Sequence, residues 1–157
     1  MELEKWYDVH VITQNVDDLH ERAGSSDVLH LHGELMKVRS LRHPERVYTL
    51  DKEHLVTTPD TLDPYGDHVR PHIVFFQEAV PNIERAISLT EQADIFVVIG
   101  TSLAVYPAAS LLHYVQSGVP VYYIDPKPAP VPAAVTVIPD SASAGLRKLI
   151  GMLKPGD

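Results

Sequence analysis

The fold class of this chain is decided by one stretch of sequence, I-F-V-V-I-G-T-S at residues 95–102. Residues 95–99 form an unbroken apolar run, which is typical of a strand buried on both faces of a parallel sheet. Gly100 and two hydroxyl residues come where this strand is expected to end. The stretch therefore predicts a parallel strand that is buried on both faces and has a polar carboxyl end.

Segments on both sides of this strand repeat the alternation of strand and helix. Apolar, β-rich segments predict further strands at residues 9–13, 28–31, 73–76, 119–124 and 135–138. Apolar spacing and helix-starting residues predict helices at 17–22, from 81 onward, at 107–115 and at 141–153. This order predicts an α/β fold, a Rossmann-like open parallel sheet, in which ligands bind at the carboxyl ends of the strands.

Residues 36–69 differ in texture from the rest, because charged residues and prolines occur there without periodicity. A structureless loop of this length is unusual in a compact domain, so we expect short elements around 47–50 and 52–56. We therefore predict a small inserted module at 36–69 and a sheet domain built from residues 1–35 and 70–157.

Composition and charge argue against several classes of function. The chain has 13 Lys and Arg against 21 Asp and Glu, a formal net charge of −8, whereas nucleic-acid binding favours a basic face. It has no cysteine, which excludes disulfides, thiolate zinc ligands and a cysteine nucleophile. No apolar run approaches the roughly 18 residues of a membrane span, and residues 1–10 lack an apolar export signal. We expect a cytoplasmic protein that binds neither nucleic acid nor membranes.

Polar side chains follow two of the predicted strands. The sequence T-Q-N-V-D-D at residues 13–18 suits a polar turn that caps a helix, or a site that orients a polar ligand or a water molecule. His30 and His32 lie two residues apart on one strand, so their side chains share a face. The pair fits a metal site or, with more support, a general base, since histidine titrates near neutral pH and His32 precedes Gly33 at the strand end.

The carboxyl ends of two further strands carry groups suited to a nucleotide. Gly100, Thr101 and Ser102 fit phosphate contact through backbone N–H groups and hydroxyls, although such triplets are common. Asp125 suits a ribose hydroxyl, or an ordinary turn before Pro126. The G-x-G-x-x-G fingerprint of dinucleotide sites does not occur in the sequence.

Five motifs, taken together and in order, resemble the sirtuin family of NAD-dependent protein deacylases, and R-P-H-I-V resembles its bacterial branch. The motifs are T-Q-N-V-D-D-L-H-E-R-A-G (13–24), L-H-G-E-L (31–35), R-P-H-I-V-F-F-Q-E (70–78), A-D-I-F-V-V-I-G-T-S-L-A-V-Y-P-A-A (93–109) and Y-I-D-P-K-P (123–128). The resemblance implies a protein-lysine deacylase that uses NAD, transfers the acyl group to ADP-ribose and releases nicotinamide. The alternative is a truncated, non-catalytic relative that binds NAD, ADP-ribose or a peptide.

The resemblance also implies roles for individual residues. His32 would act as general base through the ribose hydroxyls of NAD, and Asn15 would position the water or the ribose. The NAD-binding residues that it implies are Gln14, Asn15, Val16, Asp17, Gly100, Thr101, Ser102 and Asp125. An acyl-lysine peptide would pair, as an added strand, with the segment of Val74, Phe75, Phe76, Gln77 and Glu78. Phe76 would lie beside the acyl channel.

Three features depart from the family pattern. The zinc module of the family carries two pairs of cysteines, whereas here Ser40 occupies the place of the first, and we expect residues 36–69 to hold no metal. Gln77 replaces the glycine of the usual F-G-E. The family's first strand and glycine-rich cofactor loop are missing, so residues 1–35 and 70–157 are expected to form a partial NAD-binding domain. The edge exposed in this way predicts self-association.

Overall fold

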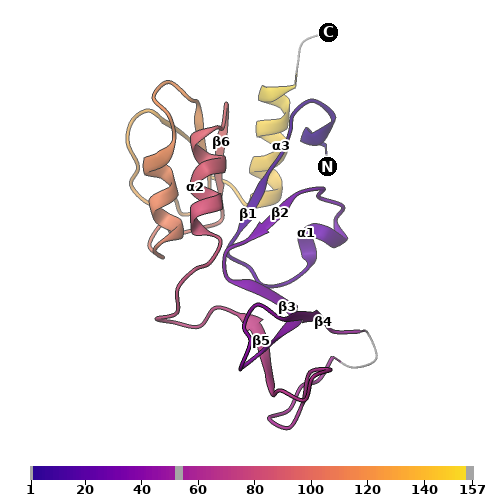
Figure 1. The fold of residues 1–157 in the computed structure, drawn as a ribbon. Coiled ribbons are helices and arrows are strands. Elements are labelled where there is room, and N and C mark those ends of the chain that lie inside the picture. The colour runs from indigo at the N-terminus through magenta and orange to yellow at the C-terminus, as the bar shows by residue number, and fades with distance from the viewer. Residues whose placement is uncertain (1, 52–54, 155–157) are drawn as a thin grey trace. The chain divides into compact units, whose positions relative to one another are not determined.

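The computed structural model describes residues 2–51 and 55–154, which divide into two compact units (Figure 1). One unit contains residues 1–10 and 82–157, and the other contains residues 11–81. Each unit has its own sheet structure, so the two are described separately. The predicted boundaries of the inserted module, 36 and 69, stay a prediction.

The larger unit is built on the parallel sheet that the apolar run predicts. Strands β6 (Phe96–Ile99), β7 (Val121–Ile124) and β8 (Val135–Ile138) lie in the order β6-β7-β8, and both pairings are parallel. Helix α3 (Ala142–Leu153) packs on one face, where Ile124, Ile138 and Leu149 form a buried core. The presence and parallel pairing of these strands and the helix confirm the sequence prediction, with bounds that differ by a few residues. The prediction that residues 95–99 are buried on both faces is wrong, because β6 lies at the edge of the described sheet, where only Val98 is buried and Ile99 is exposed.

Close packing of α3 depends on a residue without a side chain. A Cβ atom placed on Gly145 would lie 2.3 Å from Cγ2 of Ile124, which is fully buried in β7. The helix begins at a capping residue, since the hydroxyl of Ser141 accepts a hydrogen bond from the amide of Ala144 at 3.4 Å. The sequence therefore fixes both where α3 starts and how near it approaches the sheet.

Two further helical segments of this unit, α2 (Ile83–Glu91) and η2 (Ala108–Tyr114), lie side by side (Figure 1). The first confirms the helix predicted from residue 81. The second is a 3₁₀ helix, and in its first turn the amide and the hydroxyl of Ser110 both donate to the carbonyl of Pro107, at 3.0 and 2.6 Å. A short 3₁₀ turn, η1 (Leu3–Lys5), lies near the N-terminus, and Tyr7 after it donates to the Leu153 carbonyl at 2.5 Å.

The smaller unit contains a parallel strand pair, β1 (Val11–Thr13) and β2 (Val28–His30), connected through helix α1 (Leu19–Arg22). Residue 11 pairs with residue 28 and residue 13 with residue 30, so both strands end at the same edge. This arrangement confirms the predicted strand-helix-strand order. It also places the polar segment 13–18 beside the histidine-containing segment 30–35.

An antiparallel sheet with strand order β4-β3-β5 completes the smaller unit, and it corrects two expectations. The sequence predicted no strand at the start of the 36–69 excursion, but β3 (Gly33–Ser40) is the longest strand described. The strand predicted at 73–76 lies earlier, as β5 (Val69–Ile73), because the chain turns at residues 76–78. Pro71 is accommodated in β5 because this strand lies at the edge of the described sheet. β4 (Val47–Thr49) confirms the element expected at 47–50. The element expected at 52–56 falls partly outside the described residues, and Leu55 and Val56 lie in no strand.

None of the helices in the described part of the chain is long and apolar enough to cross a membrane.

Candidate active site

The polar segment after β1 is held by its main chain. Its four consecutive carbonyls each accept one hydrogen bond from residues 30–35. The pairs are Thr13 O with Leu31 N (2.9 Å), Gln14 O with His32 Nδ1 (3.1 Å), Asn15 O with His30 Nδ1 (3.0 Å), and Val16 O with Leu35 N (2.7 Å). With every carbonyl engaged, the segment keeps one backbone conformation, and the exposed side chain of Asn15 is presented from it.

The half-buried ring of His32 has the arrangement that a general base needs. The carbonyl of Gln14 can only accept a hydrogen bond, so Nδ1 of His32 must carry the proton. In the neutral ring this leaves Nε2 with a free lone pair. A fixed tautomer of this kind is how proteins commonly orient a histidine for chemistry at its other nitrogen.

Two polar residues of the segment also act as local caps, which was one of the two interpretations that the sequence left open. Thr13 Oγ1 accepts the Asn15 amide at 3.1 Å, and Asp17 Oδ1 accepts the Leu19 amide at 3.1 Å at the start of α1. The carboxylate of Asp17 is therefore partly occupied by the backbone. The amide side chain of Asn15 has no such local role.

The sequence is compatible with His30 as a metal ligand or a base, but the structure gives it a different environment. Its ring is buried, with Nδ1 at 3.0 Å from the Asn15 carbonyl and Nε2 at 2.7 Å from Oε1 of Glu21. Among residues 2–51 and 55–154 no three His, Cys, Asp or Glu side chains are grouped to hold a metal ion. Sequence reasoning missed Glu21, because its partner lies nine residues away on another element.

Gly33, directly after the candidate base, allows its main chain to pack directly against the main chain of β5. Its φ is +82°, and a Cβ atom there would lie 2.1 Å from the carbonyl oxygen of His72 and 2.9 Å from Cα of Ile73. Next to this contact, the amide of Val74 donates to the carbonyl of His32 at 2.9 Å. The predicted base and the predicted substrate segment are thus joined through their main chains.

The predicted substrate segment 74–78 is a turn, which corrects the expectation of a strand through Phe76. Gln77 has φ +72°, a left-handed conformation that favours the glycine found here in the family. Phe76 is fully exposed at the tip of the turn. The turn therefore presents an aromatic side chain to solvent, and its strained residue is the one that departs from the family motif.

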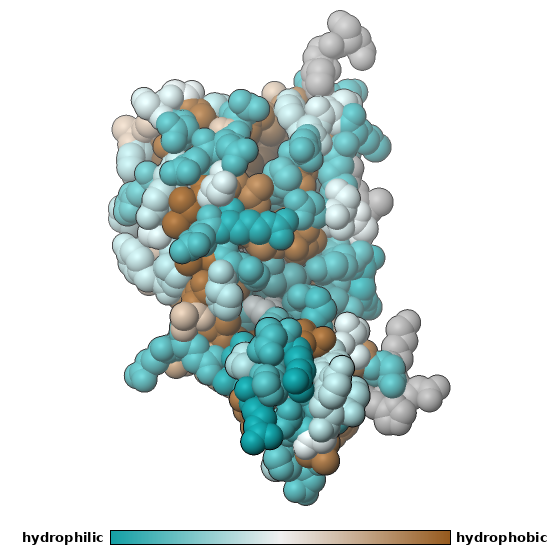
Figure 2. Space-filling model, viewed as in Figure 1, coloured by the Kyte–Doolittle hydropathy of each residue, from teal (hydrophilic) through white to brown (hydrophobic). Residues whose placement is uncertain are grey.

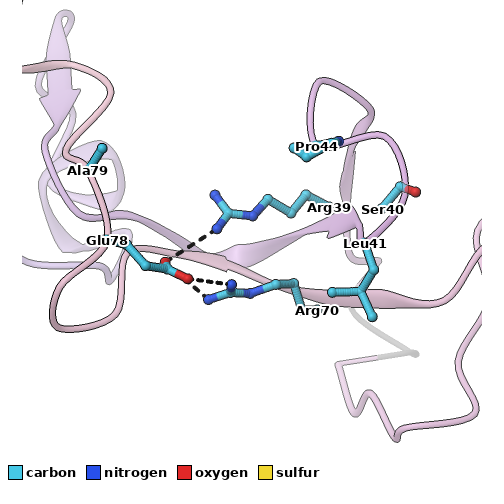
Figure 3. A pocket seen from close by; sticks show the side chains of 7 residues that line it. All are labelled: Arg39, Ser40, Leu41, Pro44, Arg70, Glu78 and Ala79. Carbon is cyan, nitrogen blue, oxygen red and sulfur yellow. Dashed lines mark hydrogen bonds and ion pairs between the residues drawn. The ribbon is translucent and has the colours of Figure 1, made fainter.

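A cluster of two arginines and one glutamate holds the end of this turn (Figure 3). Glu78 accepts hydrogen bonds from Arg70 at 2.6 and 3.2 Å, from Arg39 at 3.4 Å and from the Phe75 amide at 3.0 Å. The hydrogen bonds from Arg70 and then from Phe75 lower the pKa of Glu78 below its ordinary value. The Arg70 guanidinium also lies over the Phe75 ring, 4.5 Å from its centroid. The two arginines, which sequence reasoning missed, come from β3 and β5.

These side chains line a hollow of about 280 Å³ together with Ser40, Leu41, Pro44 and Ala79. In Figure 3, Arg39 and Arg70 both extend toward Glu78. On the face shown in Figure 2, strongly hydrophilic side chains gather over the region of β3 to β5. This part of the smaller unit is therefore polar around the turn.

A structural zinc, which the family resemblance implies at Ser40, does not fit the residues present. The Ser40 side chain is buried, and its hydroxyl accepts the amides of Arg42 at 3.2 Å and His43 at 3.1 Å. A serine hydroxyl is not a zinc ligand of the usual kind, and this one already closes a backbone turn. At this position the side chain stabilises the backbone turn through hydrogen bonds.

The second group of predicted NAD-binding residues lies in the larger unit. Gly100 to Ser102 follow β6 and Asp125 follows β7, and because these strands are parallel neighbours the two loops lie at one edge of the sheet. The Gly100 amide donates to the Ile124 carbonyl at 2.9 Å, and a Cβ on Gly100 would meet no atom within 4 Å. Asp125 Oδ1 accepts the Lys127 amide at 2.7 Å, which is the turn role considered beside ribose binding.

Comparison with known proteins agrees with these motifs. Residues 2–107 match the Sir2 family. An NAD-dependent protein deacylase of Bacteroides thetaiotaomicron is 52% identical over 160 residues, which cover 98% of this chain and 68% of that protein. An NAD-dependent protein deacylase of Helicobacter pylori is 50% identical over 154 residues, covering 97% of this chain and 66% of that protein.

Solved structures give the same result. A Sir2 homologue in complex with NAD superposes with a TM-score of 0.83 at 36% identity, covering 96% of this chain and 60% of that chain. A Sir2 bound to acetylated peptide superposes with a TM-score of 0.77 at 32% identity, covering 95% and 65%. The chain thus spans about two thirds of the length of these relatives, and the Rossmann-like α/β fold predicted from the sequence is confirmed. This chain belongs to the Sir2 family.

Proposed function

We propose that this chain carries the base-containing site of an NAD-dependent protein-lysine deacylase, which transfers the acyl group to ADP-ribose and releases nicotinamide. The observation that carries the proposal is the ring of His32, held by the Gln14 carbonyl so that Nε2 is free to take a proton. The deacylases that share about half of their residues with this chain support it.

The residues present fit NAD. Asn15 offers an exposed amide from a segment whose carbonyls are all engaged, and Gly100 leaves open space in front of a backbone that a phosphate can approach. We propose that NAD is held by Gln14, Asn15, Val16, Asp17, Gly100, Thr101, Ser102 and Asp125. When bound, it supplies an electrophilic ribose carbon with nicotinamide as the leaving group.

The chain's own contribution is positioning and proton transfer. Nε2 of His32 accepts a proton from a hydroxyl group, while Nδ1 keeps its own proton on the Gln14 carbonyl. The amide of Asn15 orients the ribose or a water molecule. Positioned groups of this kind act because they cost no rearrangement when charge develops.

We further propose that an acyl-lysine peptide contacts the turn of Val74, Phe75, Phe76, Gln77 and Glu78. Phe76 is fully exposed there, and the Glu78 cluster fixes the end of the turn. The formal net charge of −8 favours peptides rich in lysine. A solved relative is described as bound to an acetylated peptide.

Three expectations from the sequence remain proposals. They are a partial NAD-binding domain of residues 1–35 and 70–157 with a zinc-free module at 36–69, a cytoplasmic location, and self-association. Light scattering after size-exclusion chromatography tests the last of these.

Replacement of the base tests the proposed function. With an acetylated peptide and NAD, His32→Ala should lower nicotinamide release about 100-fold or more, the usual contribution of a general base, while NAD binding measured by calorimetry changes little. His68→Ala, which alters an exposed histidine of the same unit, is the matched control. NAD binding without nicotinamide release by the unsubstituted chain would favour the non-catalytic alternative. Release unaffected by His32→Ala would refute the base assignment.

A further inference from the structure

His30 is the only histidine in the described part of the chain whose ring is both buried and bonded at each nitrogen to an acceptor. The side chain is 5% exposed, with Nδ1 at 3.0 Å from the Asn15 carbonyl and Nε2 at 2.7 Å from the Glu21 carboxylate. A carbonyl and an ionised carboxylate have no proton to offer. For both hydrogen bonds to form, both ring nitrogens must carry protons, as they do in an imidazolium cation.

The charges around the ring favour this protonated form. Glu21 from α1, Asp17 and Asp18 from the preceding segment and Glu34 from β3 line the same small hollow, of about 70 Å³. Burial alone would lower the pKa of His30, but the bonds to Glu21 and Asn15 and the charges of Glu21 and Glu34 hold that pKa above its ordinary value of 6.5. The pKa of Glu21 is lowered despite its desolvation, because His30 bonds to it.

The backbone that His30 holds is also the backbone that orients the candidate base. Asn15 and Gln14 are neighbours, and their carbonyls accept from His30 and His32 respectively. If the Asn15 carbonyl is released, the peptide unit that follows the one bonded to His32 loses its anchor, the main chain beside the Gln14 carbonyl can move, and the bond that fixes the His32 tautomer weakens.

We propose that His30, clamped in its charged form between Glu21 and the Asn15 carbonyl, is a positioning residue that keeps the 14–16 segment and the His32 ring in their working geometry. The proposal rests on the proposed function for the role of His32. It assigns no direct contact with substrate to His30. It also makes the geometry of the site depend on pH through a residue that is not the base.

The direction of this pH dependence follows from the two acceptors of His30, the Glu21 carboxylate and the Asn15 carbonyl. When the pH rises through the raised pKa of His30, the ring loses one proton and can donate only one of its two hydrogen bonds. Either the Glu21 carboxylate or the Asn15 carbonyl then faces an unprotonated ring nitrogen, and that hydrogen bond is lost. Turnover should therefore fall on the alkaline side, and removing the charge of Glu21 should move that fall to lower pH.

Nitrogen-15 NMR of the histidine side chains tests the clamp without any turnover. In the unsubstituted chain at pH 6.5, both ring nitrogens of His30 should be protonated, and His32 should be predominantly the Nδ1–H tautomer when neutral. His30→Gln should give a mixture of His32 tautomers, whereas the exposed-site control His68→Gln should leave the His32 signals unchanged. A singly protonated His30, or an unchanged His32 tautomer in His30→Gln, would overturn the proposal.

Turnover over a range of pH gives the second test. His30→Gln should lower kcat/KM about 10- to 100-fold, the scale expected for a misplaced catalytic group, while His68→Gln changes it less than about twofold. Glu21→Gln should shift the alkaline limb to lower pH. Superimposable pH profiles for Glu21→Gln and the unsubstituted chain would refute the clamp. Complete absence of turnover in the unsubstituted chain would count against the proposed function, and the NMR result would still decide the role of His30.

Discussion

Replacing Gly33 by alanine should disrupt the contact between the candidate base and β5, and the structure allows its cost to be divided into two parts. The first part is the backbone conformation, because φ is +82° and an L-residue with a side chain loses about 1–2 kcal/mol there. The second part is a collision, since the new Cβ would lie 2.1 Å from the carbonyl oxygen of His72. That neighbour is backbone, so the strand itself must move, at an overpacking cost of about 1–3 kcal/mol.

Gly66 provides a matched control in the same unit. Its φ is +86°, but a Cβ there would meet no atom within 4 Å, so Gly66→Ala carries only the conformational cost. We expect losses in the free energy of unfolding of about 2–5 kcal/mol for Gly33→Ala and about 1–2 kcal/mol for Gly66→Ala. The difference between the two isolates the collision with β5.

Urea unfolding followed by circular dichroism measures both losses, and hydrogen exchange gives a local reading. The Val74 amide, bonded to the His32 carbonyl at 2.9 Å, should exchange faster in Gly33→Ala and remain protected in Gly66→Ala. Equal losses of stability in the two variants, with equal protection of Val74, would show that β5 does not press on Gly33 and would refute the reasoning.

Four further tests, one of them with a paired control substitution, have defined outcomes. Gln77→Gly should raise the free energy of unfolding by about 1 kcal/mol, because it relieves a residue at φ +72°; an unchanged urea midpoint would contradict this. Ser40→Ala should cost about 1–3 kcal/mol and speed exchange of the two amides that its buried hydroxyl accepts, while a chelator should leave the melting temperature unchanged. Gly145→Ala should destabilise through its 2.3 Å collision in urea titrations, whereas Gly151→Ala in the same helix, with open space, should stabilise by about 1 kcal/mol. Burial and then the charge of Arg39 lower the pKa of His72, so stability should fall as the pH drops below 6.5; His72→Gln should reduce that fall in urea titrations at several pH values.

The strands of the larger unit were predictable because each carries a pattern that local physics imposes. Residues 95–99 are apolar throughout, which predicts the strand β6 although not its half-buried place at the edge of the described sheet, and β8 occupies the predicted residues 135–138. Strand β3 was missed because its polar residues conceal the alternation of apolar and polar residues that is typical of a strand. Lys37 forms an ion pair with Glu34 at 2.7 Å and Arg39 forms one with Glu78. Charged residues at these positions favour the prediction of a loop rather than a strand.

Within the candidate site, the sequence predicts only those residues whose own type and position point to their role. His32 could be found from a histidine before a glycine at a strand end. Glu21, Arg39 and Arg70 could not, since their roles arise from partners 8 to 39 residues away. The turn at 74–78 was also missed, because its apolar residues Val74 to Phe76 favour a strand while Gln77 adopts a conformation that its sequence does not favour.

The four engaged carbonyls of residues 13–16 have a consequence for how this region tolerates insertions. Hydrogen bonds fix both ends of the connection between segments 13–16 and 30–35. The length of this connection therefore affects only the entropy of closing the loop, which costs about 0.6 kcal/mol for each doubling of the loop length. The turn at residues 24–27 lies beyond α1, which carries Glu21. Extra residues introduced there should leave the register of the two segments intact, which makes this turn a site for length variation and for inserting a reporter peptide.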